Sequence, residues 1–299
     1  MCIRDSIKSG PTDANGILMV TYGKEFVGNA HAGAHYNPYS IATAVLSFAR
    51  FRSDPKAVAS IRQYLDFLLA HAHKDNDGRP LHVYPFNYPS VDATAPWYSA
   101  MSQATAGSAF LWGHRVTGEQ TYLDAAVESI LALEGDTNPP FLIHRRNGLW
   151  PKEYPTWRYA VLDGALAALI GIWDLSRAMP MNDLRYPQVI ALLEKTKDGV
   201  LDGLPCFASS AYGHFYADAG YSLGSSYQRT NIRLLTYLAD LDPKFGDFAQ
   251  AFSVSTRNPI IKAWYAAILT LRGYFENRGL IERSKRPCIT ASPNVPQGR

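Results

Sequence analysis

The amino-acid sequence predicts a mainly α protein: an incomplete (α/α) toroid of about four helical hairpins plus a C-terminal helix, with few short strands in long loops. Apolar residues recur at helical spacing in paired segments, and a short turn rich in Pro, Gly, Asn or Asp separates the members of each pair. Successive pairs are joined by connections of roughly 20 residues, and connections of that length in a compact domain are usually functional. Hairpins wound in sequence place these connections at one end of a ring, around a central cavity.

The first expected pair of helices covers residues 39–52 and 55–74. Between them stands Ser53-Asp54-Pro55, and proline is favoured at the first position of a helix. The later expected pairs are 97–116 with 119–134, 156–178 with 186–202, and 224–240 with 244–253, and a last apolar helix is expected over 259–277.

Three segments follow from this pattern. Residues 1–35 form an irregular N-terminal segment, with a hairpin near 17–27, and residues 36–280 form the (α/α) domain. Residues 281–299 are polar and contain proline, so a disordered tail is expected there.

Composition limits the classes of partner. The net charge of +3 suits a polyanionic ligand, but no basic run or motif marks a nucleic-acid surface, so no nucleic acid is expected. No stretch reaches the roughly 18 apolar residues of a membrane span, and no signal peptide is visible. The compartment therefore stays open, with a cytoplasmic location expected if the chain is complete.

The three cysteines are Cys2, Cys206 and Cys288. Their spacing matches neither a zinc site nor a dense disulfide framework, so free thiols are expected, with a Cys206–Cys288 bridge as the alternative. No metal site is expected from the histidines or carboxylates.

Three long connections, residues 75–98, 140–159 and 203–229, are rich in aromatic and basic side chains. Aromatic rings stack on sugar rings, and Arg binds carboxylate in bidentate fashion. If the connections meet at one rim, they form a site for an acidic carbohydrate; the alternative is that these aromatic residues only cap helix ends. Candidate substrate-binding residues in these connections are Tyr84, Tyr88, Arg145, Arg146, Trp157, Arg158 and His214.

Several motifs resemble the glucuronyl C5-epimerase family. The run Trp97-Tyr98-Ser99-Ala100-Met101-Ser102-Gln103 resembles a signature of that family, and Glu153-Tyr154-Pro155-Thr156 and Val161-Leu162-Asp163-Gly164 resemble two more. The similarity is good over about 97–242 and looser over 36–52. The family has Asn where Asp163 stands, and two His residues where Gln228 and Asn231 stand.

The resemblance implies an (α/α) catalytic domain that inverts C5 of D-glucuronate to L-iduronate within a heparosan-type polysaccharide. It implies Glu153, Tyr154, Tyr227 and Tyr212 as catalytic residues and a homodimer as the assembly. No cofactor is required, and a structural calcium ion stays open. Further substrate contacts expected from the matching motifs are Trp97, Tyr98, Gln103, Asp163, Arg229 and Asn231.

Inversion at C5 removes the proton α to a carboxylate and returns one to the opposite face, so it needs two proton carriers. Glu153 or Tyr154 on one face and Tyr227 on the other would meet this need. A Tyr base needs a pKa lowered by nearby cations, and the supply is Arg145, Arg146, Arg158, Arg229 and His214. As alternatives, Glu153 is a first-turn helix carboxylate, and Tyr227 belongs to the core.

Two other functions stay open. A polysaccharide lyase begins with the same proton abstraction but then expels the substituent at C4. A non-catalytic glycan-binding relative keeps the aromatic rim without turnover. The fold cannot decide among the three, because (α/α) toroids carry several activities.

Overall fold

The computed structural model describes residues 10–156, 159–209, 213–214 and 225–257, together with Ile260, Ala263, Ala267 and Ile289. Over these residues the chain is mainly helical, as predicted. None of the described helices is both long and apolar enough to cross a bilayer. The long helices of the described part come in consecutive pairs: α2 (Pro38–Phe48) with α3 (Pro55–Ala70), α4 (Ala100–Thr117) with α5 (Gln120–Leu131), α6 (Leu162–Ser176) with α7 (Tyr186–Gly203), and α8 (Ser225–Leu238) with α9 (Pro243–Arg257).

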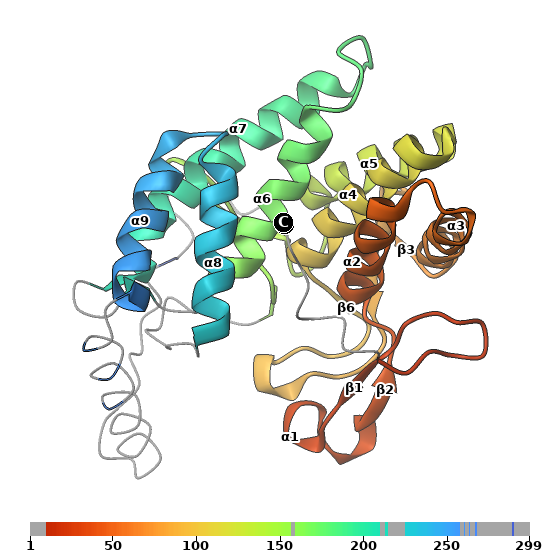
Figure 1. The fold of residues 1–299 in the computed structure, drawn as a ribbon, viewed down its shortest axis with the longest axis horizontal. Coiled ribbons are helices and arrows are strands. Elements are labelled where there is room, and N and C mark those ends of the chain that lie inside the picture. Colours follow the sequence, from red (N-terminus) through yellow and green to blue (C-terminus); the bar gives the residue numbers. More distant parts are fainter. Residues whose placement is uncertain are drawn as a thin grey trace.

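The first helices of the pairs lie side by side in chain order (Figure 1). Helix α2 contacts α4, α4 contacts α6, and α6 contacts α8. Each second helix packs against the first helix of its own pair, so α3, α5, α7 and α9 flank this row. The chain enters the four helices of the row from the side that carries the strand pairs, the lower side of Figure 1. The first turns of α2, α4, α6 and α8 therefore share one side of the molecule.

Local sequence signals explain where the helices begin and end. Asn37 caps α2 and Ser99 caps α4, each by accepting the backbone N–H three residues later, at 3.0 and 3.5 Å. Asp54 caps α3 by accepting the backbone N–H of Lys56, two residues later, at 2.9 Å, and Pro55 takes the first helical position. Helix α4 ends at Gly118, whose φ of 74° is the left-handed conformation that glycine adopts without strain.

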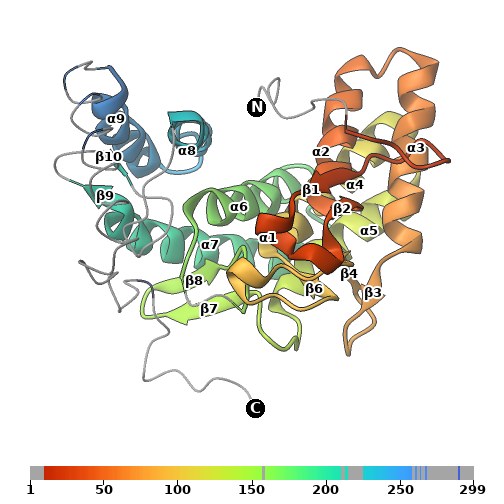
Figure 2. The ribbon, with the colours of Figure 1, turned by 90° about the horizontal axis from the view of Figure 1, so that it is seen from below.

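The described strands form two-stranded antiparallel pairs within the connections, as predicted. Figure 2 shows the pair β7–β8 beside α7. The pairs are β1 (Val20–Tyr22) with β2 (Gly33–His35), β3 (His73–Lys74) with β4 (Pro80–Leu81), β5 (Val83–Tyr84) with β6 (Trp97–Tyr98), β7 (Leu142–Arg145) with β8 (Gly148–Pro151), and β9 (Ala208–Ser209) with β10 (Gly213–His214). The short helix α1 (Lys24–Val27) lies between β1 and β2, so the N-terminal hairpin is wider than predicted.

Two helices begin later than predicted. Helix α6 starts at Leu162 instead of 156, because Tyr159 and Ala160 enter the core in non-helical conformation before the helix begins. Helix α4 starts at Ala100 instead of 97, because Trp97 and Tyr98 pair with β5. The predicted helix 259–277 lies outside the described residues, apart from three single positions.

The closely packed helices α4 and α6 form the centre of the core. Helix α6 is buried over most of its length, as its almost entirely apolar sequence predicts. An ideal Cβ on Gly171 would overlap the backbone carbonyl of Ala104, with the carbonyl carbon at 2.8 Å. Glycine at this position lets the backbones of the two helices approach, which holds the first turn of α6 in a defined place.

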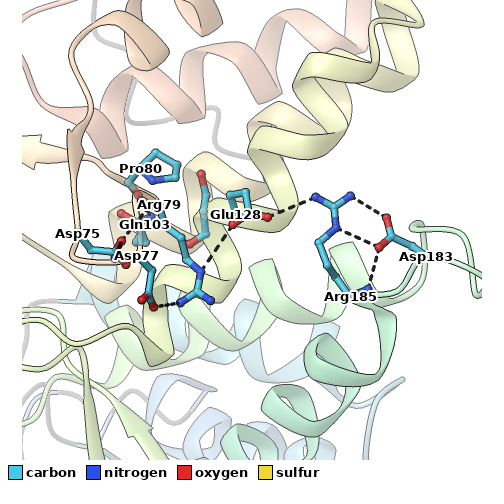
Figure 3. A network of polar contacts seen from close by, with 9 residues as sticks. Asp75, Asp77, Arg79, Pro80, Gln103, Glu128, Asp183 and Arg185 are labelled. Carbon is cyan, nitrogen blue, oxygen red and sulfur yellow. Dashed lines mark hydrogen bonds and ion pairs between the residues drawn. The ribbon is translucent and has the colours of Figure 1, made fainter.

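An ion network joins three parts of the chain (Figure 3). The Arg185 guanidinium donates to both oxygens of Asp183, at 3.0 and 2.7 Å. A further hydrogen bond from Arg185 goes to Asp124 at 2.9 Å. Arg185 also donates to Glu128 at 3.3 Å, and Glu128 pairs with Arg79 at 3.6 Å. The hydrogen bonds from Arg185 lower the pKa of Asp183 to about 2. The network ties the start of α7 to α5 and to the β3–β4 turn.

Substitution of Arg185 by Ala is expected to lower the free energy of unfolding by about 1–2 kcal/mol, because three partly buried carboxylates lose a shared donor. Urea unfolding measures this change. Arg50→Ala is the control, since Arg50 is exposed and forms no ion pair with a described residue. Equal midpoints for the two variants would contradict the prediction.

Cys206 is disulfide-bonded, so the expectation of free thiols was wrong for this residue. Its partner lies outside the described residues. Sequence spacing does not reveal such a bond, because bridging depends on the distance between Cβ atoms in the folded chain. Ile289 is 2% exposed and packs beside Gly203 at the end of α7, whereas the rest of the predicted tail 281–299 lies outside the described residues.

Candidate active site

Two carboxyl groups meet where the chain enters α6. Glu153 lies just after β8 and is 5% exposed, and Asp163 stands in the first turn of α6 and is partly exposed. The Oε2 atom of Glu153 and the Oδ1 atom of Asp163 are out of contact with solvent and have no hydrogen-bond partner. Buried polar atoms without partners are uncommon in folded proteins, and each requires an explanation such as a catalytic role or a bound group.

The Glu153 side chain lies directly against the backbone that follows Asp163. An ideal Cβ on Gly164 would lie 2.5 Å from Cβ and 2.6 Å from Oε2 of Glu153, closer than real Cβ contacts. The carboxyl group therefore requires glycine at position 164. Because α6 begins at Leu162, Glu153 is not a first-turn helix carboxylate, and that alternative does not hold.

The two carboxyl groups differ in their electrostatic environment. Burial raises the pKa of Asp163 to about 6, although the backbone N–H groups of residues 163 and 164 at the helix start favour its charged form. Burial and, next, the charge of Asp163 raise the pKa of Glu153 well above its ordinary value, against a smaller opposite effect of a hydrogen bond with Tyr154. Of the two carboxyl groups, Glu153 therefore holds its proton more strongly than Asp163.

An aromatic wall, formed by Tyr84, Tyr88, Trp97 and Tyr154, stands beside Glu153. The Tyr154 ring lies 5.9 Å from the rings of both Tyr88 and Trp97. Trp97 stacks on Tyr84 at 3.9 Å with nearly parallel planes, and the two are 7% and 3% exposed. Their faces are covered, so we expect them to support the wall, whereas Tyr88 and Tyr154 are more exposed and can meet a sugar.

The phenol groups of Tyr84 and Tyr88 remain protonated at neutral pH. Burial raises the pKa of Tyr84 well above its usual value and raises that of Tyr88, and the charge of Glu153 contributes to both shifts. The Tyr84 hydroxyl has a hydrogen bond with Ser102. These two hydroxyl groups are therefore hydrogen-bonding groups and not bases.

Tyr22 extends the wall from the N-terminal hairpin, and sequence reasoning missed it. Its ring lies 4.6 Å from Phe86 and 6.3 Å from Tyr88, and its hydroxyl accepts a hydrogen bond from Asn37 Nδ2 at 2.6 Å. Burial raises the pKa of Tyr22 to about 12. The sequence carries no signal for this role beyond one aromatic residue in a short strand.

Two of the three aromatic connections meet, as expected. The Thr156 hydroxyl donates to the carbonyl of Val91 at 3.2 Å, and the Ala100 N–H donates to the carbonyl of Lys152 at 3.0 Å. These bonds join the segment that carries Glu153 and Tyr154 to the segment that carries Tyr88 and Trp97. Most of the third connection, residues 203–229, lies outside the described residues.

Other expected substrate-binding residues are engaged within the protein. Gln103 is fully buried, and its amide bonds to the backbone of Pro80, His82 and Ser129. The Tyr98 hydroxyl donates to the carbonyl of Pro139 at 2.6 Å.

Two of the expected cations, Arg145 and Arg146, lie at the β7–β8 turn. Arg145 binds Asp202 of α7 through Nε and Nη2, at 3.1 and 2.7 Å. Arg146 is exposed in the adjacent turn. Neither is described in contact with the carboxyl pair, so Arg145 holds the hairpin that precedes Glu153.

Helix α8 carries three further residues that were expected in the site. Tyr227 lies in its first turn, on the helix adjacent to α6, and Arg229 is exposed on the next turn. Asn231 is 0% exposed, and neither polar atom of its amide has a hydrogen-bond partner. Trp157, Arg158 and Tyr212 lie outside the described residues, as do the side chains of Tyr227 and His214. Among the described residues, no group of His, Cys, Asp and Glu has the arrangement of a metal site.

Two solved structures of sugar epimerases are similar to the chain. One is a sugar epimerase from a ruminal bacterium, with a TM-score of 0.51 and 12% identity over 82% of this chain and 66% of that one. The other is cellobiose 2-epimerase from Spirochaeta thermophila DSM 6192, with a TM-score of 0.49 and 15% identity over 73% of this chain and 57% of that one. The chain thus spans less than two thirds of either structure, and the first likeness concerns the fold alone.

No curated protein matches the chain. The family described as D-glucuronyl C5-epimerase C-terminus matches residues 79–253, which is more than half of the chain and includes both carboxyl groups, the aromatic wall and α8. The chain therefore belongs to the D-glucuronyl C5-epimerase C-terminus family.

Proposed function

We propose that this chain is the catalytic domain of an epimerase that inverts C5 of D-glucuronate to L-iduronate within a heparosan-type polysaccharide. The observation that carries the proposal is the buried carboxyl group of Glu153, which has one oxygen without a hydrogen-bond partner and lies beside Tyr154, within the region that matches the epimerase family. A neutral carboxylic acid at neutral pH is a proton donor, and reprotonation of C5 needs one.

The reaction has two proton transfers. A base removes the C5 proton, and the electron pair of the broken C–H bond moves into the neighbouring carboxylate to give an enediolate. An acid on the opposite face then donates a proton to C5, which forms the new C–H bond and inverts the centre. We assign the donor to Glu153, directly or through the Tyr154 hydroxyl.

Tyr227 is the proposed base. Its backbone lies in the first turn of α8, where the partial positive charge of the helix N-terminus favours a phenolate. Helix α8 contacts α6, whose first turn carries Asp163, so the two turns approach the same side of the molecule (Figure 1). This placement supports a sugar bound between Tyr227 and the Glu153 loop. Tyr212 is a second proposed phenol of the same connection.

The neighbouring order of α2, α4, α6 and α8 supports an incomplete (α/α) toroid as the architecture, with the site at the end where the chain enters these helices. Tyr88, Tyr154, Arg229 and Asn231 are the described side chains proposed to bind the acidic polysaccharide. A homodimer is part of the same proposal, and its mass in solution tests it.

Heparosan incubated with the protein in deuterated water is expected to gain deuterium at C5 while its chain length stays unchanged. Proton NMR measures the loss of the C5–H signal and the appearance of iduronate. Tyr227→Phe is expected to abolish the exchange, and exchange at the wild-type rate would remove Tyr227 from the mechanism.

The same incubation separates the alternatives. An unsaturated uronate, seen by its ultraviolet absorbance, would mean that the electron pair expels the C4 substituent, which makes the protein a lyase. Binding of heparosan without isotope exchange would mean a glycan-binding relative. Either result contradicts the proposed epimerase.

A further inference from the structure

We propose that Asp163 is a positioning residue that keeps Glu153 protonated, so that the two carboxyl groups together hold a single proton at neutral pH. Asp163 then sets the direction of proton transfer without contact with the reacting carbon. The inference rests on the proposed function only for the catalytic role of Glu153. The sharing of one proton is a property of the folded chain and is measurable without substrate.

The geometry supports a shared proton. The Glu153 carboxyl lies against the backbone of Gly164, directly after Asp163, and only the absence of a Cβ at 164 allows this approach. One oxygen of each acid is shielded from solvent and unpartnered. Within the part of the chain that the structure describes, neither acid forms an ion pair, so two negative charges here would have no countercharge among those residues. Two neighbouring carboxyl groups in such a place do not both ionise near neutral pH.

The described groups that face Glu153 are phenols and Asp163. On the wall side, Tyr84 and Tyr88 face Glu153 with phenols that stay neutral. In its own loop, Tyr154 is its hydrogen-bond partner, and the Lys152 ammonium is directed to the carbonyl of Pro155 at 2.7 Å. From α6, the group that faces it is Asp163, and Asp163 is negative.

The pair is asymmetric, and this decides which acid keeps the proton. Asp163 accepts the backbone N–H groups at the start of α6 and retains some contact with solvent, both of which stabilise a carboxylate. Glu153 is almost fully buried and has a neighbour of like charge. The proton therefore resides on Glu153, the acid nearer to Tyr154, and Asp163 retains it there by repulsion between the two charges.

Infrared spectroscopy of the whole chain tests the inference without substrate. The wild-type protein at neutral pH is expected to show a protonated-carboxyl band that Glu153→Gln removes. In Asp163→Asn the band is expected to disappear on titration at a pH lower by about one unit or more, because ionisation of Glu153 no longer opposes a neighbouring charge. Asn has the same size as Asp, so the variant keeps the packing.

Asp174→Asn is the matched control, since Asp174 stands near the other end of α6 and binds Arg177 and Tyr237. It is expected to leave the band and its titration unchanged. A wild-type band that is absent at neutral pH, or one that titrates identically in Asp163→Asn, would overturn the inference. Glu153→Gln provides a second measurement: Asp163 should titrate close to its wild-type pH there, because its neighbour is already neutral when it ionises.

Deuterium uptake by heparosan tests the effect of Asp163 on activity, in addition to the infrared test. If Glu153 is the acid, the loss of activity at high pH is expected at a lower pH in Asp163→Asn than in the wild-type protein. A protein that shows the infrared shift but no exchange with heparosan contradicts the proposed function alone. A protein that exchanges deuterium but shows no shift contradicts the role of Asp163 alone.

Discussion

Replacement of Glu153 by Gln is expected to reduce deuterium uptake at C5 by about 10²–10⁴-fold, the range that a positioned acid or base contributes. Gln fills the same volume at a site that is 5% exposed, but it has no proton to transfer. NMR of heparosan in deuterated water measures the rate. Glu194→Gln is the control, because that side chain is 53% exposed on α7, and it should retain wild-type activity. Activity of Glu153→Gln above one tenth of the wild-type value would exclude Glu153 as the acid.

Stability measurements on Glu153→Gln distinguish a loss of catalysis from a loss of folded protein. The pKa of Glu153 is higher in the folded protein than in the unfolded chain, so the protonated acid is compatible with the fold at low pH. As the pH rises from the unfolded towards the folded value, ionisation favours unfolding. Gln cannot ionise, so the variant should be at least as stable as the wild type, and more so at high pH. Thermal unfolding at low and high pH checks this sign.

Gly199→Ala is expected to lower the free energy of unfolding by about 3 kcal/mol, at the upper end of the usual cost of overpacking. An ideal Cβ at this position of α7 would overlap the backbone N, C and O atoms of Leu149, with the carbonyl carbon at 2.5 Å. Backbone atoms in a strand pair cannot move aside as a flexible side chain can. Strand β8 would shift, and with it the loop that places Glu153, so deuterium uptake should fall as well. Urea unfolding measures the stability.

Gly246→Ala is the matched glycine control. It lies in α9, where the nearest atom to an ideal Cβ is the Cβ of Ala239 at 3.3 Å. The gain in helix propensity, about 1 kcal/mol, offsets this mild contact. Similar unfolding midpoints for the two alanine variants would show that β8 tolerates displacement.

Local chemistry accounts for the helix pairs that the sequence predicts. The turn Ser53-Asp54-Pro55 supplies a cap and a first-position proline, and Thr117-Gly118 supplies a left-handed end, so both turns lie where expected. The predicted first residues of helices differ from the observed ones where contacts with distant parts of the chain decide the conformation. Trp97 and Tyr98 were expected to be helical, but they pair with β5, which lies on the far side of a loop.

The sequence motifs name several residues that the structure places in the candidate site. Glu153, Tyr154 and Asp163 were identified from motifs, whereas Gln103 was expected to bind substrate and instead bonds to backbone groups of the core. Motif matching identifies positions that a family requires, but it does not distinguish a residue that supports the fold from one that meets the ligand. Tyr22 comes from a separate hairpin and contacts the wall only after the chain folds.

The sequence by itself determined the order and approximate bounds of the helices and the proton-carrying side chains near the start of α6, because caps and periodicity act within a few residues of the chain. Only the tertiary structure decided that Glu153 lies against Gly164 beside Asp163, with a buried oxygen that has no partner. Proton affinity depends on solvent exclusion and on charges nearby in space. These depend on how β8, α6 and the aromatic wall pack together, which neighbours in sequence do not specify.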